Sequence, residues 1–149
     1  MNSDPSPSPF PSSAPALGSP LDTATTAMRH WTDGAASGDW SRLVAMLDED
    51  VLFHVPVTGF EGVRHGVDAA GAFFDHLAAV LRADLTVTSA LTAGARIGFE
   101  VTVRGIMQGR QFVQALCLVF RIAGDRVVAF HEYLAWPGGL DPEALYEPG

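Results

Sequence analysis

The second half of the chain has four consecutive segments with strand character, and this run limits the possible fold more than any other feature. The expected strands cover residues 85–91, 95–105, 111–122 and 126–136. They are rich in apolar and β-branched residues, and Ala123-Gly124-Asp125 provides a tight hairpin before the last one. Strands that follow one another through short turns predict an antiparallel sheet.

Helical periodicity is confined to the first half of the chain. An apolar stripe through Met28 and Trp31 predicts a first helix with its cap at Asp22 or Thr23. A second, short helix is expected after Asp39, and residues 67–81 show the most regular helical spacing. A short strand ended by Pro56 lies between the last two. Helices followed by strands predict an α+β fold with the helices on one face of the sheet.

One folded domain is expected between two tails. A length of 149 residues suits a single core. Residues 1–22 are rich in proline and serine and are interpreted as a flexible tail, residues 23–136 as the domain, and residues 137–149 as a C-terminal tail. No basic start followed by an apolar run occurs, and no segment has membrane-spanning length, so we expect a cytoplasmic protein with no membrane partner.

Charge and composition exclude several kinds of chemistry. The net charge is −8 and no basic cluster occurs, which argues against nucleic-acid binding. All nine basic residues are arginines, so a lysine Schiff base or a lysine-anchored pyridoxal cofactor is excluded. The single cysteine, Cys117, cannot form an internal disulfide. No pair of residues has the spacing of a metal site, and we therefore expect neither a metal nor a cofactor.

The expected last strand carries two adjacent ionisable residues, His131 and Glu132, among apolar neighbours. Because successive residues of a strand point to opposite faces, Phe130, Glu132 and Leu134 share one face and His131 lies on the other. A carboxylate on a buried face is costly to desolvate unless it is paired, which makes Glu132 a candidate acid or base. The alternative is that Glu132 faces solvent or pairs with an arginine.

Four short motifs carry a resemblance to a known family. They are Ala36-Ser37-Gly38-Asp39-Trp40, Leu47 to Pro56, Glu61 to Gly66, and Phe120 to Tyr133. Their order and spacing over about residues 23 to 136 resemble the nuclear transport factor 2-like superfamily, specifically its SnoaL-like polyketide cyclase and ketosteroid isomerase branch. The resemblance implies a cone-shaped, curved antiparallel sheet that packs on three N-terminal helices and encloses one apolar pocket.

The resemblance can be followed residue by residue. The positions that look like the catalytic ones of ketosteroid isomerases hold Trp31, Val55 and Ala115, so that isomerase mechanism is not expected. Two positions that resemble those of limonene epoxide hydrolases hold His54 and Glu132, both able to move a proton. The paired arginine and aspartate of those hydrolases have no counterpart, because the matching residues, Phe99 and Val101, are apolar.

The resemblance implies that His54 and Glu132 form an acid–base pair across the pocket. Two alternatives remain: His54 is a structural histidine bonded to a loop carbonyl, or Val55 faces the pocket instead. The other pocket residues are expected to be Trp31, Val55, Phe74, Val101, Val103, Ala115, Cys117, Phe130 and Leu134. His30, His65 and His76 are interpreted as solvated. The outer sheet face, with His131, Tyr133, Gln114, Leu116 and Leu118, is the expected homodimer surface.

These expectations lead to two hypotheses of function. The first is a cofactor-independent enzyme that uses acid–base chemistry on a small, apolar, oxygenated molecule such as a polyketide or terpenoid intermediate. The reaction would be a cyclisation, an isomerisation or an epoxide opening. The second is a non-catalytic ligand-binding or dimeric assembly module of the same fold.

Overall fold

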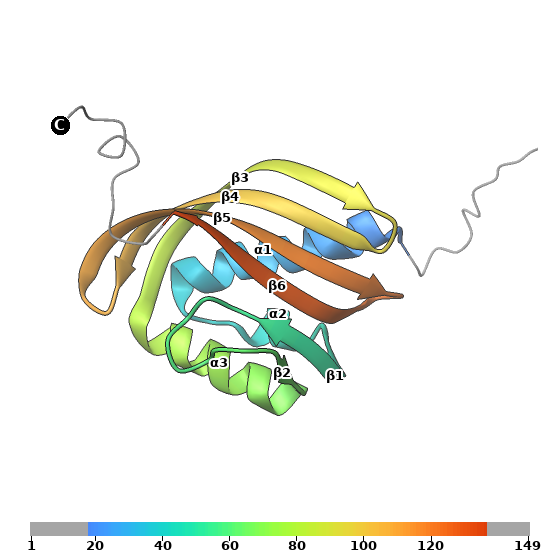
Figure 1. The fold of residues 1–149 in the computed structure, drawn as a ribbon, viewed down its shortest axis with the longest axis horizontal. Coiled ribbons are helices and arrows are strands. Elements are labelled where there is room, and N and C mark those ends of the chain that lie inside the picture. Colours follow the sequence, from blue (N-terminus) through green and yellow to red (C-terminus); the bar gives the residue numbers. More distant parts are fainter. Residues whose placement is uncertain (1–17, 137–149) are drawn as a thin grey trace, which may run out of the picture.

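The computed structural model describes residues 18–136, which form three helices and six strands (Figure 1). In chain order the elements are α1 (Pro20–Ser37), α2 (Ser41–Val44), β1 (Leu47–His54), β2 (Arg64–His65), α3 (Val67–Val80), β3 (Leu81–Ala93), β4 (Arg96–Met107), β5 (Arg110–Ala123) and β6 (Arg126–Trp136). The expected C-terminal tail and most of the expected N-terminal tail lie outside the described residues.

All six strands belong to one sheet with the order β2-β1-β6-β5-β4-β3. The four long C-terminal strands pair antiparallel as predicted, and the α+β class is confirmed. The sheet is nevertheless mixed, because β1 pairs parallel to β6. No tight turn joins these two strands, and the remaining elements of the fold separate them along the chain. Their direction is therefore free of the constraint that a hairpin imposes.

The sheet is strongly curved and stays open rather than closing into a barrel (Figure 1). The strands β3, β4 and β5 arch over α1, while α3 lies against the end formed by β1 and β2. The pairing of β3 with β4 shifts between Val87 and Ser89, and such a bulge bends a strand. The helices thus cover the concave face, as the resemblance implied.

The first helix begins earlier than the sequence pattern predicted. Ser19 is its cap, since the Ser19 hydroxyl accepts a hydrogen bond of 3.1 Å from the Asp22 amide. The Asp22 carboxylate in turn accepts from the Ser19 amide at 3.4 Å, which completes a capping box. Pro20 occupies the first helical position, where its missing N–H costs nothing. The cap at Asp22 or Thr23 was therefore wrong, and the predicted tail 1–22 overlaps the helix.

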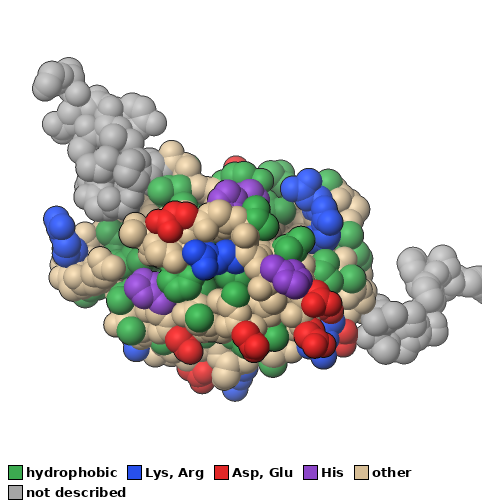
Figure 2. Space-filling model, turned by 60° about the horizontal axis from the view of Figure 1, so that its bottom comes forward, with side chains coloured by type: hydrophobic (Ala, Val, Ile, Leu, Met, Phe, Trp, Pro, Cys, Tyr) green, Lys and Arg blue, Asp and Glu red, His purple; other side chains and the backbone are tan. Residues whose placement is uncertain are grey.

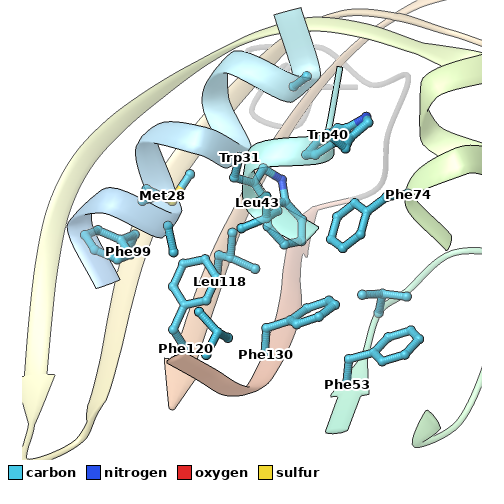
Figure 3. Packing of buried hydrophobic residues seen from close by; sticks show 14 of the residues in the cluster. Met28, Trp31, Trp40, Leu43, Phe53, Phe74, Phe99, Leu118, Phe120 and Phe130 are labelled. Atoms are coloured by element: carbon cyan, nitrogen blue, oxygen red, sulfur yellow. The ribbon is translucent and has the colours of Figure 1, made fainter. Parts of the chain in front are cut away.

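Trp31 of α1 lies at the centre of the core (Figure 3). Its indole meets four other aromatic rings edge-on, with centroid distances of 5.2–6.1 Å. These rings belong to Trp40, Phe74, Phe120 and Phe130. They come from the loop before α2, from α3 and from two strands of the sheet, so one side chain joins every layer of the fold. Edge-on pairs of this kind add to the stabilisation from burial alone.

The interior of α1 approaches Trp40 so closely that a side chain would not fit between them. A β-carbon placed on Gly34 would lie 2.5 Å from the Trp40 ring. We therefore expect Gly34→Ala to force the Trp40 ring out of its position and to lower the free energy of unfolding by about 1–3 kcal/mol. Urea denaturation followed by tryptophan fluorescence measures this change.

The matched control is Gly71→Ala in α3. No heavy atom lies within 4 Å of the β-carbon that this change adds. Because alanine is the better helix former, we expect a gain of about 0.5–1 kcal/mol in the free energy of unfolding. If Gly34→Ala were equally stabilising, the close packing of α1 against Trp40 would be contradicted.

Candidate functional site

A cavity of about 210 Å³ opens beside the aromatic core, between the concave sheet face and the helices. Trp31, Phe73 and Leu77 contribute to its wall from the helical side. The loop after β1 and the four long strands complete it. Its other apolar wall residues are Pro56, Val57, Leu81, Leu85, Val103, Met107, Phe112 and Leu116. The mostly apolar lining with a few polar side chains is typical of a site for a small molecule.

Five polar side chains line the same cavity. They are Thr58, His76, Gln108, Gln114 and Glu132. Among the residues that line this space in the described part of the chain, Glu132 is the one carboxylate. The two glutamines can both donate and accept hydrogen bonds, which suits them to hold an oxygen atom of a ligand.

Glu132 lies on the concave face because of its position in β6. It pairs across the sheet with Leu118, two residues after the pair formed by Phe130 and Phe120. Phe130, Leu118 and Phe120 are fully buried. Glu132 continues this inward-facing row to the point where the core gives way to the cavity.

The surroundings of Glu132 favour its neutral form. Burial raises the pKa of the Glu132 carboxyl from 4.5 to about 7. Among residues 18–136, no ion pair reaches this carboxyl. Desolvation disfavours the charged form, and no cation compensates for it. At neutral pH the group can therefore both release and accept a proton.

His54 lies on the opposite face of the sheet from Glu132. Phe53 and Val55 are both buried toward the core, so the side chain between them points outward. There the His54 ring meets the His131 ring at a centroid distance of 4.6 Å. The expected acid–base pair of His54 and Glu132 is therefore not formed. Val55 instead points inward, where it is buried in the core beside the cavity.

The remaining expected pocket residues divide into three groups. Trp31 and Val103 line the cavity. Val55, Phe74, Val101 and Phe130 are buried in the core beside it rather than in its wall. Ala115, Cys117 and Leu134 instead border a shallow hollow with Glu100 and Tyr133.

The placement of Ala115 and Cys117 corrects a one-residue error in the expected face of β5. Phe112, Leu116 and Leu118 form the inward set, which places the residues between them on the outer face. Gln114 belongs to the inward set and was wrongly expected outside. The alternation of the bulky residues from Phe112 to Ile122 was the signal that could have identified it.

His76, interpreted from the sequence as solvated, is another residue of the cavity wall. It lies on α3 one residue before Leu77, and its ring is 5.4 Å from that of Phe60. The spacing of the apolar residues in α3 puts His76 at the border between the buried and exposed sides of the helix. Its position at the cavity depends on the loop after β1, which covers that border.

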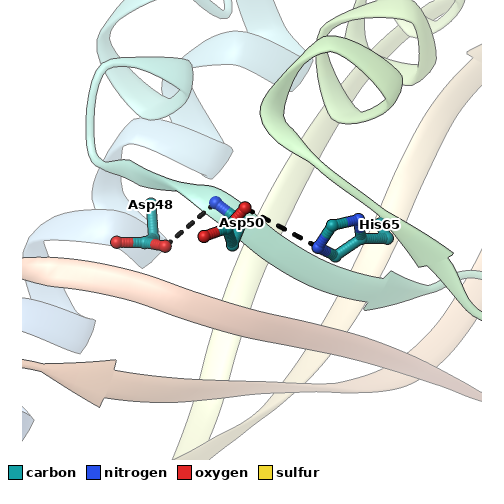
Figure 4. Close-up of polar contacts among 3 residues, drawn as sticks. All are labelled: Asp48, Asp50 and His65. Carbon is teal, nitrogen blue, oxygen red and sulfur yellow. Dashed lines mark hydrogen bonds and ion pairs between the residues drawn. The ribbon is translucent and has the colours of Figure 1, made fainter.

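A polar contact between β1 and β2 lies at the surface. His65 Nε2 lies 3.8 Å from Asp50 Oδ1, and the Asp50 amide donates a 2.9 Å hydrogen bond to Asp48 (Figure 4). Both side chains of the ion pair are exposed, so the contact contributes little stability. From the side of α3 and β2, acidic, basic and hydrophobic side chains are interspersed on the surface (Figure 2).

Two features are absent from residues 18–136. No group of three or more histidine, cysteine, aspartate or glutamate side chains there could hold a metal ion. None of the helices in that range combines the length and the apolar character needed to cross a membrane.

Comparison with known proteins places this geometry in a family context. A family model described as a SnoaL-like domain matches residues 28–130. Among curated proteins there is no match. An NTF2-like protein from Anabaena variabilis is 24% identical with a TM-score of 0.74, over 79% of this chain and 90% of that one.

Two further solved structures share the fold. An LEH-like epoxide hydrolase from M. tuberculosis is 17% identical, with a TM-score of 0.62 over 76% of this chain and 83% of that chain. A hypothetical protein with a ketosteroid isomerase-like fold from Catenulispora acidiphila, in complex with trimethylamine, is 15% identical. Its TM-score is 0.61, over 72% of this chain and 83% of that chain. At these identities the likeness establishes the fold.

The raised pKa of Glu132 makes stability depend on pH. The pKa in the folded protein, about 7, is above the ordinary value of 4.5, so the folded state binds the proton more tightly. Its contribution to stability is present below pH 4.5 and is lost as the pH rises toward about 7. We expect this loss to be about 3 kcal/mol in the wild type and absent in Glu132→Gln.

The measurement is urea denaturation of both proteins across this pH range. The difference in unfolding free energy should grow in favour of Glu132→Gln with rising pH. The control is Glu49→Gln, which changes an exposed glutamate on β1 and should follow the wild-type profile. A constant difference between Glu132→Gln and the wild type would mean that the carboxyl is well solvated.

Proposed function

The chain belongs to the family of SnoaL-like domains within the NTF2-like superfamily, and we propose that it is a cofactor-independent enzyme with Glu132 as its acid–base group. The substrate is a small, apolar molecule that carries oxygen, such as a polyketide or terpenoid intermediate. The observation that carries the proposal is a carboxyl with a pKa of about 7 at the wall of an apolar cavity. A pKa near the working pH is what general acid–base catalysis requires.

The cavity supports proton transfer with residues of this chain alone. As a carboxylate, Glu132 takes a proton from a carbon next to a carbonyl group and, as the acid, returns it to another atom of the same molecule. In epoxide opening, the neutral acid protonates the ring oxygen as its C–O bond breaks, and a water molecule that adds to the carbon gives its proton to the carboxylate. The amide N–H groups of Gln114 and Gln108 line the same space and can donate hydrogen bonds to an oxygen that gains negative charge. Cyclisation, isomerisation and epoxide opening all proceed through steps of this kind.

The proposed mechanism uses one acid–base residue, Glu132, whereas the sequence predicted a pair of Glu132 and His54. His54 lies on the other sheet face and takes no part. His76 is the histidine that shares the cavity with Glu132, and it can orient a water molecule or a substrate oxygen. The M. tuberculosis neighbour, an LEH-like epoxide hydrolase, makes epoxides one class of substrate to test.

The decisive experiment is turnover of a panel of apolar epoxides and polyketide-like ketones. We expect Glu132→Gln to keep the fold and to lose about 100- to 10,000-fold in turnover, because glutamine cannot carry the proton. Glu49→Gln should retain full activity. Rapid turnover by a folded Glu132→Gln protein would remove the assignment, and no turnover of any panel member by the wild type would count against an enzyme.

A second candidate is a binding protein for a small organic cation. Trp31, Phe73 and Phe112 line the cavity with Glu132, and aromatic faces together with a carboxylate attract ammonium groups. The Catenulispora acidiphila neighbour was solved in complex with trimethylamine. A bound cation would favour ionised Glu132, so the cation would bind more tightly as the pH rises through 7.

Calorimetric titration separates the two candidates. Trimethylamine should bind more tightly than tert-butanol, a neutral molecule of similar shape, and Glu132→Gln should remove this preference. Equal affinities for the two compounds would exclude the cation-binding candidate and leave the enzyme as the function to pursue.

We also propose that the protein is a homodimer through the outer face of its sheet. Leu91 of β3 and Tyr133 of β6 are 57% and 47% exposed there. Cys117 lies directly opposite Tyr133, and Val119 lies in the same cross-strand row as Leu91.

Equilibrium sedimentation should give the mass of a dimer, and Tyr133→Asp should shift the equilibrium toward monomer. Leu21→Asp, which changes an exposed leucine on α1, should not.

A further inference from the structure

A second hollow of about 210 Å³ lies on the outer sheet face, away from the Glu132 cavity. Its polar lining consists of His54, Arg96, Arg121 and His131. Its apolar part includes Leu52 and Val63, which are 45% and 72% exposed. Four basic side chains thus gather in one hollow of a chain whose net charge is −8.

The sheet register brings these four side chains together from four different strands. Arg96 of β4 and Arg121 of β5 are direct cross-strand partners, and Arg121 is opposite Ala129 of β6. In the adjoining row, Val119 is opposite His131, which is opposite His54 of β1. Side chains at directly opposed positions have β-carbons about 4.5–5.5 Å apart. Because the side chain of Ala129 is small, a space remains between the two arginines and the two histidines.

Arg96 and Arg121 are in an unfavourable arrangement by themselves. Like charges at directly opposed positions of a sheet repel each other. Within residues 18–136, neither guanidinium forms an ion pair with a carboxylate. On the same face, Glu100 is hydrogen-bonded to Ser89, and Asp50 lies beside His65.

The hollow also changes the pKa of the His131 imidazole. Its pKa is lowered by burial first, and then by repulsion from His54 and from Arg96. The phenol ring of Tyr133 stacks on the His131 ring at a centroid distance of 3.9 Å. An anion in the hollow would oppose the repulsion and favour protonated His131.

We propose that this hollow binds a small organic oxyanion, a carboxylate or a phosphate ester. The oxyanion lies between Arg96 and Arg121, whose guanidinium groups can each donate two parallel hydrogen bonds. The apolar part of the ligand lies against Leu52 and Val63. His131 and His54 complete the site as donors on its far side. The site is separate from the cavity of the proposed enzyme and does not depend on its chemistry. It borders the proposed dimer surface and shares Val119 with it, so binding is measured at protein concentrations at which sedimentation has defined the oligomeric state.

The test follows the ring-proton resonances of His131 and His54 by NMR while inorganic sulfate is added. Sulfate is chosen because its charge stays constant over the range in which histidine titrates. We expect saturable shifts beyond those caused by sodium chloride of equal ionic strength, and tighter binding at lower pH. Benzoate should bind more tightly than acetate, since its ring covers Leu52 and Val63.

Matched variants decide whether the arginines are responsible. Arg121→Gln should weaken sulfate binding at least about tenfold, because a charged hydrogen-bond donor is lost. Arg110→Gln, an exposed arginine at the start of the same strand, should leave binding unchanged. Glu132→Gln should also bind sulfate normally, which separates this site from the proposed enzymatic one.

Stability provides a second readout. In chloride alone, Arg121→Gln should have a higher Tm than the wild type, because it relieves the repulsion from Arg96, whereas Arg110→Gln should not. The proposal is overturned if sulfate shifts the histidine resonances no more than chloride does, or equally in Arg121→Gln. An unchanged or lower Tm of Arg121→Gln would contradict the repulsion on which the site rests.

Discussion

The packing of Trp31 against the concave face of the sheet is the interaction on which the rest of the structure depends. Its ring contacts aromatic side chains from α3, β5 and β6, and it also forms part of the cavity wall. Helix α1 thus fills the concave side of the sheet next to Phe120 and Phe130. Farther along the strands, the concave side is not filled, and this space is the cavity. The cavity exists because the strands extend farther than the aromatic core does.

The properties of Glu132 follow from its place at this border. Two residues earlier in β6, the inward position is held by Phe130, which the core covers completely. At Glu132 the same row reaches the cavity, so its carboxyl loses most of its hydration without gaining an ionic partner. A position deeper in the core could not hold a carboxylate, and a position nearer the end of the strand would leave it hydrated.

The sequence predicted the order of the elements well, because period and turn residues act locally. The last strand covers residues 126–136 as predicted, and the inward direction that Glu132 shares with Phe130 follows from alternation. The faces of β1 and β5 were harder to assign. His54 was placed at the pocket by its resemblance to a position of limonene epoxide hydrolases, although buried Phe53 and Val55 on either side require it to point outward. Two other features depend on contacts distant in sequence and could not be predicted: the parallel pairing of β1 with β6, and the covering of His76 by the loop after β1.

Two neighbouring residues of β6 illustrate how one strand separates two chemical environments. Burial raises the pKa of Glu132 on the concave face and lowers that of His131 on the outer face. Each shift favours the neutral form, and each has desolvation as its first cause. Each side chain therefore faces a hollow in which a ligand of opposite charge would reverse the shift. The two proposed sites thus lie on opposite faces of a single sheet, and a ligand in either should shift the titration of its own residue, Glu132 or His131.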